Sequence, residues 1–201
     1  MEILNLSPGG FACACYLVYK QQDAVLIDCS VDADILQREL ALRQLRLHAI
    51  LCTHGHFDHI LTADAVRKQC DVPLFLHQKD ADMPADGIKN AYSVFFGKER
   101  CWQPAQRLFA DGDTLTFGDL TFTVMHTPGH TAGSSVFVCD NTVFTGDTLF
   151  VHGYGRTDLY SGDGAQLRRS LQALSLLPPT HRIYPGHGSP AVLEQALSHL
   201  F

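Results

Sequence analysis

The run Thr53-His54-Gly55-His56-Phe57-Asp58-His59 constrains this chain more than any other part of its sequence. Three histidines and a carboxylate fall within seven positions, directly after the apolar residues 48–52. That apolar stretch predicts a buried strand. Core packing does not require so many ionisable side chains at the end of a strand, so the run indicates a chemical site. The fold must present it on a loop held by a rigid scaffold.

Three later clusters share this pattern, because each follows an apolar strand and lies in a Gly-rich or Pro-rich turn. They are Thr127-Pro128-Gly129-His130, Gly146-Asp147-Thr148 and Pro185-Gly186-His187-Gly188. Neutral imidazole and carboxylate are ligands that suit Zn, Fe and similar metals. One tetrahedral catalytic site takes three protein ligands and keeps one open position. The clusters therefore predict two adjacent metals, and the two oxygens of Asp147 could bridge them.

Strands alternate with helices in both halves of the chain. The sequence predicts strands over residues 12–19, 24–28, 48–52, 73–77, 114–117, 120–125, 135–139, 142–145 and 182–184. It predicts helices over residues 30–46, 59–69 and 164–176 and at the end of the chain, with Ser30 capping the first. Gly118-Asp119 and Asp140-Asn141 are typical of hairpin turns. Residues 78–106 have no clear assignment. This alternation favours two sheets, or one mixed sheet, covered by helices.

Length, charge and cysteine content narrow the class of protein. A chain of 201 residues is expected to form a single domain, residues 1–201. Its net charge of −6 without basic runs argues against nucleic-acid and membrane partners. We expect no signal peptide, because residues 1–5 lack basic and apolar regions. Seven cysteines without a CxxC pair indicate reduced core thiols and a cytoplasmic protein, with Cys13 and Cys15 on one face of a strand.

The four clusters together resemble the ligand motifs of the metallo-β-lactamase fold superfamily. Residues 53–59 are similar to its THxHxDH signature, and Pro128-Gly129-His130, Gly146-Asp147 and Gly186-His187-Gly188 follow in the same order. The resemblance implies an αββα sandwich, with two mixed β-sheets flanked by helices and the metals at one edge. It also implies a ligand set: His54, His56 and His130 for one metal, Asp58, His59 and His187 for the other, and Asp147 between them.

Within that superfamily, residues 146–150 and Gly153-Tyr154-Gly155-Arg156-Thr157-Asp158 look most like the short bacterial glyoxalase II group. The resemblance implies hydrolysis of thioesters such as S-lactoylglutathione. Two divalent ions, with Zn preferred over Fe or Mn, would lower the pKa of a shared water so that hydroxide attacks the carbonyl. Asp58 and Asp147 are the expected catalytic carboxylates. Only fourteen residues follow His187, so the C-terminal helical domain of full-length glyoxalase II is expected to be absent.

Substrate contacts are expected at Arg156 and at two tyrosines. The Arg156 guanidinium would hold a substrate carboxylate, although an ion pair with Asp158 explains it equally well. Tyr154 and Tyr160 are candidate pocket walls. Asp28 is expected to orient a ligand, or else to cap its strand. Histidines outside the clusters are expected not to bind metal: His48, His77, His152, His181 and His199.

A second enzyme class shares the same motifs. The related persulfide dioxygenases use one iron held by two histidines and a carboxylate. Here these ligands would be His54, His130 and Asp147. An inactive scaffold is a third interpretation, which the complete ligand set disfavours. The sequence leaves the choice between hydrolase and dioxygenase open, and it does not define the acyl group, the thiol carrier or the oligomeric state.

Overall fold

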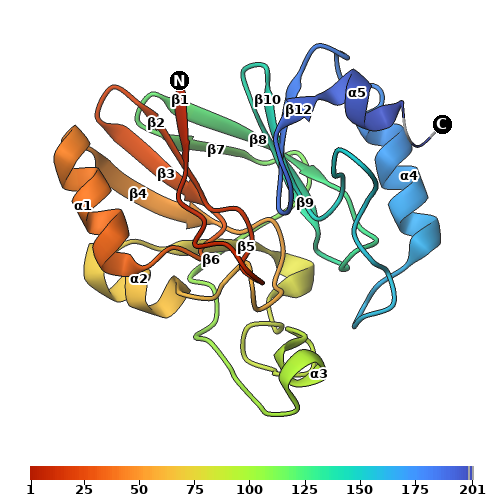
Figure 1. Cartoon of the computed structure of the whole chain (residues 1–201), viewed down its shortest axis with the longest axis horizontal. Helices are drawn as coiled ribbons and strands as arrows, with labels where there is room; N and C mark the ends of the chain where they lie inside the picture. The colour runs from red at the N-terminus through yellow and green to blue at the C-terminus, as the bar shows by residue number, and fades with distance from the viewer. Residues whose placement is uncertain (199, 201) are drawn as a thin grey trace.

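Two six-stranded mixed sheets form the centre of the computed structural model, which describes residues 1–198 and 200 (Figure 1). The first sheet has the order β1-β2-β3-β4-β5-β6. Its strands are β1 (Glu2–Asn5), β2 (Tyr16–Lys20), β3 (Asp23–Ile27), β4 (Arg46–Leu51), β5 (Leu74–His77) and β6 (Arg107–Phe109). β1, β2 and β3 pair antiparallel, whereas β3, β4, β5 and β6 pair parallel.

The second sheet has the order β12-β11-β10-β9-β8-β7. Its strands are β7 (Thr114–Phe117), β8 (Leu120–His126), β9 (Ser135–Cys139), β10 (Thr142–Gly146), β11 (Arg182–Pro185) and β12 (Ala191–Val192). All neighbours are antiparallel except β10 and β11, which are parallel. The hairpins β7–β8 and β9–β10 confirm the turns predicted at Gly118-Asp119 and Asp140-Asn141.

Helices cover the outer face of each sheet, which confirms the predicted αββα sandwich. In Figure 1, α1 (Ala33–Arg43) and α2 (Ala63–Cys70) lie on one side of the strands. On the other side lie α4 (Gly164–Leu174) and α5 (Leu193–Leu197). The short helix α3 (Tyr92–Phe96) lies beyond the strands at the lower end of the view, and the 3-10 turn η1 (Gln78–Asp80) follows β5.

The apolar residues of β3 show why this chain needs layers on both faces of its first sheet. Val25 and Ile27 pack into the core between the sheets, together with Phe122 of β8. Ala24 and Leu26 face the other way, into the core beneath the helices. Successive side chains of a strand point to opposite faces, so a continuous apolar run is stable only when both faces are covered.

Several predicted boundaries were wrong. Residues 12–15 are not part of a strand, although Cys13 and Cys15 are buried as expected. Asp32 rather than Ser30 caps α1, accepting hydrogen bonds from two backbone amides, whereas the Ser30 hydroxyl donates to the Cys13 carbonyl. The second helix begins at Ala63 rather than at residue 59, because residues 54–59 form the loop that presents the histidines.

The sequence also missed two strands of the first sheet, β1 and β6. Both are short edge strands: β1 has only exposed or half-buried residues, and β6 has one buried residue, Phe109, so neither carries a strong apolar pattern. Among the described helices, none is both long enough and apolar enough to span a bilayer.

Candidate metal centre

Four strands, β4, β8, β10 and β11, deliver the four polar clusters to one edge of the sandwich, and β3 delivers Asp28 to the same edge. β3 and β4 run parallel in the first sheet, and β8, β10 and β11 share one direction in the second. Backbone hydrogen bonds join the two sheets at that edge. The Ser135 amide donates to the Thr53 carbonyl at 2.9 Å, and the Ala14 amide donates to the Gly186 carbonyl at 2.7 Å. The loops that follow these strands therefore meet, as the sequence predicts.

His54, His56 and His130 form the first group of candidate ligands. His54 Nε2 lies 3.0 Å from His56 Nδ1 and 3.2 Å from His130 Nε2, and the last two atoms are 2.9 Å apart. All three side chains are buried. The three nitrogens form a compact triangle, which is the arrangement of three protein ligands around one metal.

Asp58, His59 and His187 form the second group, and Asp147 lies between the two groups. Asp58 Oδ2 lies 3.1 Å from His187 Nε2 and 3.7 Å from His59 Nε2. Asp147 Oδ2 lies 3.6 Å from His130 Nε2 of the first group and 3.7 Å from His187 Nε2 of the second. Its Oδ1 lies 3.3 Å from His59 Nε2. One carboxylate thus contacts ligands of both groups.

The donor atoms of the two groups fit metal ions. His59 Nε2 and Asp147 Oδ1 are buried and have no hydrogen-bond partner. Burial, reinforced by the neighbouring rings, lowers the pKa of His54 well below its usual range and that of His56 to about 3. Both rings are therefore neutral at physiological pH and offer lone pairs. Buried polar atoms without partners are costly, and cations between these atoms would satisfy them.

The electrostatics of the second group also favour a cation. Burial opposes the charged form of His59, but Cys13, Asp28, Asp58 and Asp147 together raise its pKa well above the ordinary value. Burial likewise opposes ionisation of Asp147, yet the neighbouring histidines, with His59 foremost, lower its pKa. Both shifts show that this region stabilises positive charge.

Hydrogen bonds behind the ligands determine which ring nitrogen is available. His59 Nδ1 donates to Asp28 Oδ2 at 2.8 Å, so Asp28 orients a candidate ligand as expected. His130 Nδ1 donates to the Arg156 carbonyl at 2.7 Å. The Thr53 hydroxyl lies 3.0 Å from Asp28 Oδ2 and 3.1 Å from His54 Nδ1. Such contacts leave the opposite nitrogen of each ring available for a metal.

Asp80 is a structural contributor that the sequence did not reveal. Its carboxylate is buried and accepts three hydrogen bonds, from the Gly55 amide at 3.1 Å, the Thr131 hydroxyl at 2.7 Å and the Gly133 amide at 2.7 Å. It therefore ties the loop of His54 and His56 to the loop of His130. Its position just after β5, at the edge where the other clusters meet, was a signal that could have pointed to it.

Gly186 leaves the space that the ligands occupy. A Cβ at this position would lie 2.3 Å from Asp147 Oδ1 and 2.7 Å from His59 Cε1. Both contacts are much shorter than van der Waals distance. The glycine of the Pro-Gly-His turn is therefore required by the close approach of two candidate ligands.

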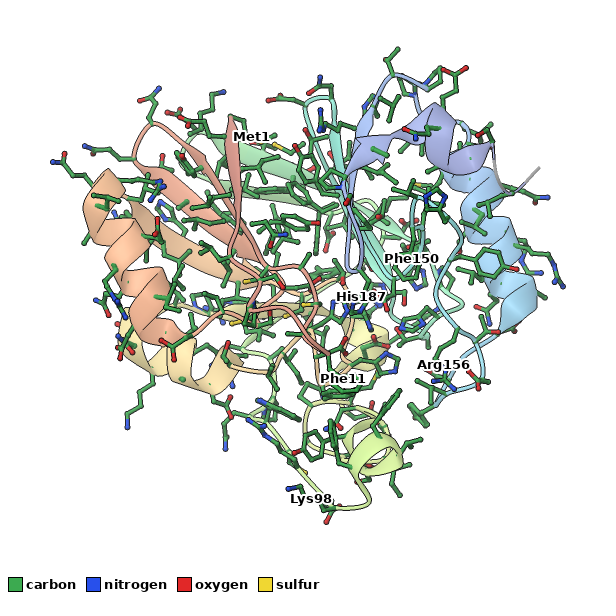
Figure 2. The ribbon with its side chains drawn as sticks, in the orientation of Figure 1. Met1, Phe11, Lys98, Phe150, Arg156 and His187 are labelled. Carbon is green, nitrogen blue, oxygen red and sulfur yellow. The ribbon has the colours of Figure 1, made fainter. Side chains whose placement is uncertain are left out.

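A cavity of about 260 Å³ opens over the ligands. Figure 2 shows that Phe11, His187 and Arg156, far apart in sequence, gather in one region of the molecule. The lining residues are Gly10, Phe11, His56, Phe57, Asp58, Ala91, Phe95, His130, Asp147, Arg156, Leu159 and His187. Phe57 belongs to the histidine run, but Phe11, Phe95 and Leu159 could not be predicted to line the cavity, because only the tertiary structure brings their segments together.

The residues predicted to contact substrate are only partly brought to this cavity. Arg156 lines it, but its Nε and Nη2 donate to the two oxygens of Asp158 at 2.6 and 2.7 Å. Arg156 therefore lies at the cavity, where a substrate carboxylate would bind, and it also forms the ion pair with Asp158. Tyr154 instead lines a separate pocket with Arg168 and Gln172. The ring of Tyr160 lies beneath Lys89 and is not part of the cavity lining.

Histidines outside the clusters have other partners where the structure gives them. His48 contacts Asp23 at 2.6 Å, His77 stacks on His126 with ring centroids 4.2 Å apart, and His181 contacts the Pro178 carbonyl. His199 lies outside the described residues.

Cys13 is closer to the centre than expected, because its sulfur lies within 4.8 Å of ligand atoms of Asp28 and His59.

An αββα sandwich whose edge carries seven histidine and aspartate side chains suited to bind metal is typical of one class of metal-dependent proteins. The family model of the metallo-β-lactamase superfamily matches residues 8–187. The chain is also 33% identical to YqgX of Bacillus subtilis, described as a probable metallo-hydrolase, over 94% of this chain and 90% of that protein. The chain therefore belongs to the metallo-β-lactamase superfamily.

Solved structures of similar proteins support the same assignment. BLEG-1, described as a B3 metallo-β-lactamase, has 35% identity and a TM-score of 0.91 over 98% of this chain and 97% of that one. A di-iron-bound form of TTHA1623 has 32% identity and a TM-score of 0.83, with 96% of each chain covered. ETHE1 from Myxococcus xanthus has 29% identity and a TM-score of 0.81, over 99% and 83%.

Proposed function

We propose that this protein is a binuclear metallo-hydrolase that cleaves thioesters, with acyl-glutathiones such as S-lactoylglutathione as the substrate type. The observation that carries the proposal is the position of Asp147 between two groups of three ligands each. Each group alone has the ligand number of a catalytic metal site. Glyoxalase II-like activity also agrees with the segment 146–158 of the sequence.

Zinc is the metal we propose for both positions, with iron or manganese as alternatives. Imidazole and carboxylate ligands suit all three metals, so the donor set does not select among them. The di-iron form of the similar protein TTHA1623 supports a centre with two metals. Purified protein should therefore contain close to two equivalents of metal per chain by elemental analysis, and a single equivalent would contradict the binuclear centre.

Bound divalent metals would polarise a substrate carbonyl and lower the pKa of a water molecule. The chain itself supplies two carboxylates for that water. Burial works against ionisation of Asp58, but His59 and His187 hold its pKa below the ordinary value, and Asp147 is affected in the same direction. Both stay ionised, so they can orient the attacking water by accepting its hydrogens. The departing thiolate is a weak base and requires no proton donor from the protein.

A persulfide dioxygenase is the second candidate function, and the similarity to ETHE1 favours keeping it. Its ligands would be His54, His130 and Asp147. His54 Nε2 and Asp147 Oδ2 lie 3.2 and 3.6 Å from His130 Nε2, so these three residues also form a group. This alternative does not use Asp58, His59 or His187, and that difference provides the test.

The decisive experiment compares wild type with Asp58→Ala in two assays, with metal content measured in parallel. For a binuclear hydrolase, wild type cleaves the thioester, and Asp58→Ala loses that activity by several orders of magnitude together with about half of its metal. Asp82→Ala is the matched control, because Asp82 is exposed and pairs with Lys89 away from the centre. A cephalosporin is included as a further substrate because of the similarity to BLEG-1. Oxygen uptake with glutathione persulfide that survives in Asp58→Ala, without thioester cleavage by wild type, would overturn the proposal.

A further inference from the structure

The cavity over the metal centre is apolar apart from the candidate ligands and one arginine. Phe11, Phe57, Phe95 and Leu159 provide its largest apolar side chains. Among the described lining residues other than the ligands, none has a hydroxyl or carboxamide side chain. A polar group that entered this cavity beyond reach of the ligands and Arg156 would lose its water without gaining a hydrogen-bond partner, which is costly.

The aromatic part of this lining is packed into a defined wall. The Phe57 ring lies 5.6 Å from the Phe95 ring and 5.5 Å from the Phe96 ring, measured between centroids. The Phe11 ring lies 6.4 Å from the Phe96 ring in an edge-on contact. Phe57 stands between His56 and Asp58 in sequence, so the loop that carries the metal ligands also anchors the wall.

Of the three phenylalanine rings that line the cavity, two are exposed. Phe11 is 77% exposed and Phe95 is 46% exposed. Exposed apolar rings that line a cavity gain free energy when an apolar ligand removes them from water. The two rings come from segments that are far apart in the chain, Phe95 from α3 (Tyr92–Phe96) and Phe11 from the N-terminal region, and both line the cavity.

Arg156 is the one lysine or arginine among the described lining residues, and its charge is already paired. Its guanidinium donates two hydrogen bonds to Asp158 and lies 5.7 Å from the centre of the Phe95 ring. Guanidinium has five N–H donors, so some remain for a carboxylate at the rim. A cavity of about 260 Å³ is small for a ligand pocket and suits an acyl group better than a tripeptide carrier.

From this arrangement we infer that the cavity is an acyl subsite selective for thioesters with an unsubstituted, apolar acyl group. The acyl chain lies against Phe11, Phe95 and Leu159, and the thiol carrier extends outward past Arg156. This inference rests on the proposed function, and it specifies the substrate class. A longer linear or aromatic acyl group is preferred over a short one such as acetyl or lactoyl, because only the longer group reaches the apolar wall.

The test uses glutathione thioesters that differ only in the acyl group: acetyl, propanoyl, butanoyl, hexanoyl and lactoyl. Each methylene that enters the cavity should raise kcat/KM about fourfold, from the free energy of burying one CH₂. Lactoyl places its hydroxyl beside the reacting carbonyl, within reach of the candidate ligands, so it should behave as a short acyl group and fall well below hexanoyl. Equal kcat/KM values from acetyl to hexanoyl would overturn the acyl subsite.

Variants show which residues produce the preference. Phe95→Ala and Phe11→Ala should each reduce the ratio of kcat/KM for hexanoyl over acetyl by about tenfold, roughly the effect of one to two lost methylene contacts. Leu176→Ala is the matched control, because Leu176 is exposed and lies outside the cavity lining. It should keep the wild-type ratio. If the two phenylalanine variants also keep that ratio, the wall does not hold the acyl group.

A binding arm separates failure of this inference from failure of the proposed function. S-hexylglutathione and S-methylglutathione are thioethers that cannot be hydrolysed, and calorimetry on the metal-loaded protein measures their affinity. Tighter binding of the hexyl compound, lost in Phe95→Ala, supports the subsite even if no thioester is cleaved. In that case the hydrolase proposal alone fails. Equal or absent binding of the two thioethers overturns the subsite even if lactoylglutathione is cleaved.

Discussion

Asp80 illustrates how a single side chain can maintain the geometry of a site that it does not itself enter. It accepts hydrogen bonds from two different ligand loops, and the Gly133 position leaves no room for any other side chain, since a Cβ there would lie 2.5 Å from the Asp80 carboxyl carbon. The three nitrogens of the first group depend on the spacing of these loops. We therefore regard Asp80 as a positioning residue for His54, His56 and His130.

Asp80→Ala should weaken the first metal position selectively. The substitution leaves two buried backbone amides without acceptors, each at a cost of about 1–3 kcal/mol. We expect a lower melting temperature and loss of about one metal equivalent in titrations with a competing chelator. Asp86→Ala is the control, because Asp86 is a surface carboxylate that also accepts backbone hydrogen bonds. Unchanged metal affinity in Asp80→Ala would contradict the positioning role.

The same residue should give the metal-free protein a characteristic dependence of stability on pH. Burial raises the pKa of Asp80 from 3.8 to about 6, so the folded protein holds this proton more tightly than the unfolded chain. Protonated Asp80 therefore contributes about 3 kcal/mol to the free energy of unfolding. This contribution is complete below pH 4 and is lost as the pH rises through 6. Asp80→Asn lacks this titration. Urea unfolding of both metal-free proteins from pH 4 to 7 should show wild type losing stability relative to Asp80→Asn, and a constant difference would refute it.

Arg156 is the residue at which binding and structure can be separated. If it holds a carboxylate of the thiol carrier, Arg156→Ala should raise KM for acyl-glutathiones far more than it lowers kcat, because that contact is the same in the ground and transition states. Arg156→Lys should be partly impaired, since it loses the planar fork. Asp158→Ala removes the ion pair but keeps the guanidinium. Unchanged kinetics in Arg156→Ala would identify the residue as a partner of Asp158 alone.

At the scale of elements, the strands β10 and β11 run parallel, so the turns that follow them place Asp147 and His187 at the same edge of the sheet. Gly146 has a φ of +49°, and a Cβ there would lie 2.4 Å from the Thr53 hydroxyl. Gly186 faces Asp147 and His59 at similarly short range. Both glycines therefore allow the second sheet to approach the histidine loop of the first.

Gly186→Ala should lower the content and affinity of the second metal, because its Cβ would displace Asp147 or His59. Gly164→Ala, at the start of α4, is the matched control. There the nearest atom to a new Cβ is 3.4 Å away, and alanine favours helix. Metal titration followed by thermal unfolding distinguishes the two variants. Full occupancy in Gly186→Ala would show that the turn can relax around an added methyl group.

At the scale of the whole molecule, the candidate metal ligands come from both sheets. His54, His56, Asp58 and His59 follow β4 of the first sheet, whereas His130, Asp147 and His187 follow strands of the second. Metals bound there would link the two sheets at their shared edge. Binding to the folded state alone stabilises it by about 2.7 kcal/mol per metal at a free concentration one hundred times Kd.

Chelation should therefore lower the melting temperature and loosen one edge of the sandwich while preserving the core. Hydrogen exchange should accelerate in residues 53–59, 127–130, 146–148 and 185–188, which carry the ligands. Amides of residues 136–139 in β9 serve as the internal reference, because these residues are mostly buried and lie beyond the Ser135 amide that donates to Thr53. Uniform acceleration along the whole chain would instead show that the fold as a whole depends on metal.

The sequence by itself pointed to the candidate ligands, because histidine and aspartate in close, ordered clusters are not explained by packing. It also determined the two halves and most strands, since a run such as residues 24–28 is stable only when buried on both faces. Sequence reasoning missed the edge strands β1 and β6, the cap at Asp32, the clamp at Asp80 and the wall of Phe11 and Phe95. The cap at Asp32 is local, since it accepts from the amides of Asp34 and Ile35. The other features depend on partners that are distant in the chain and that no local pattern records. Tertiary structure alone brought those groups together, because the packing of two sheets decides which loops share an edge and which side chains line the space between them.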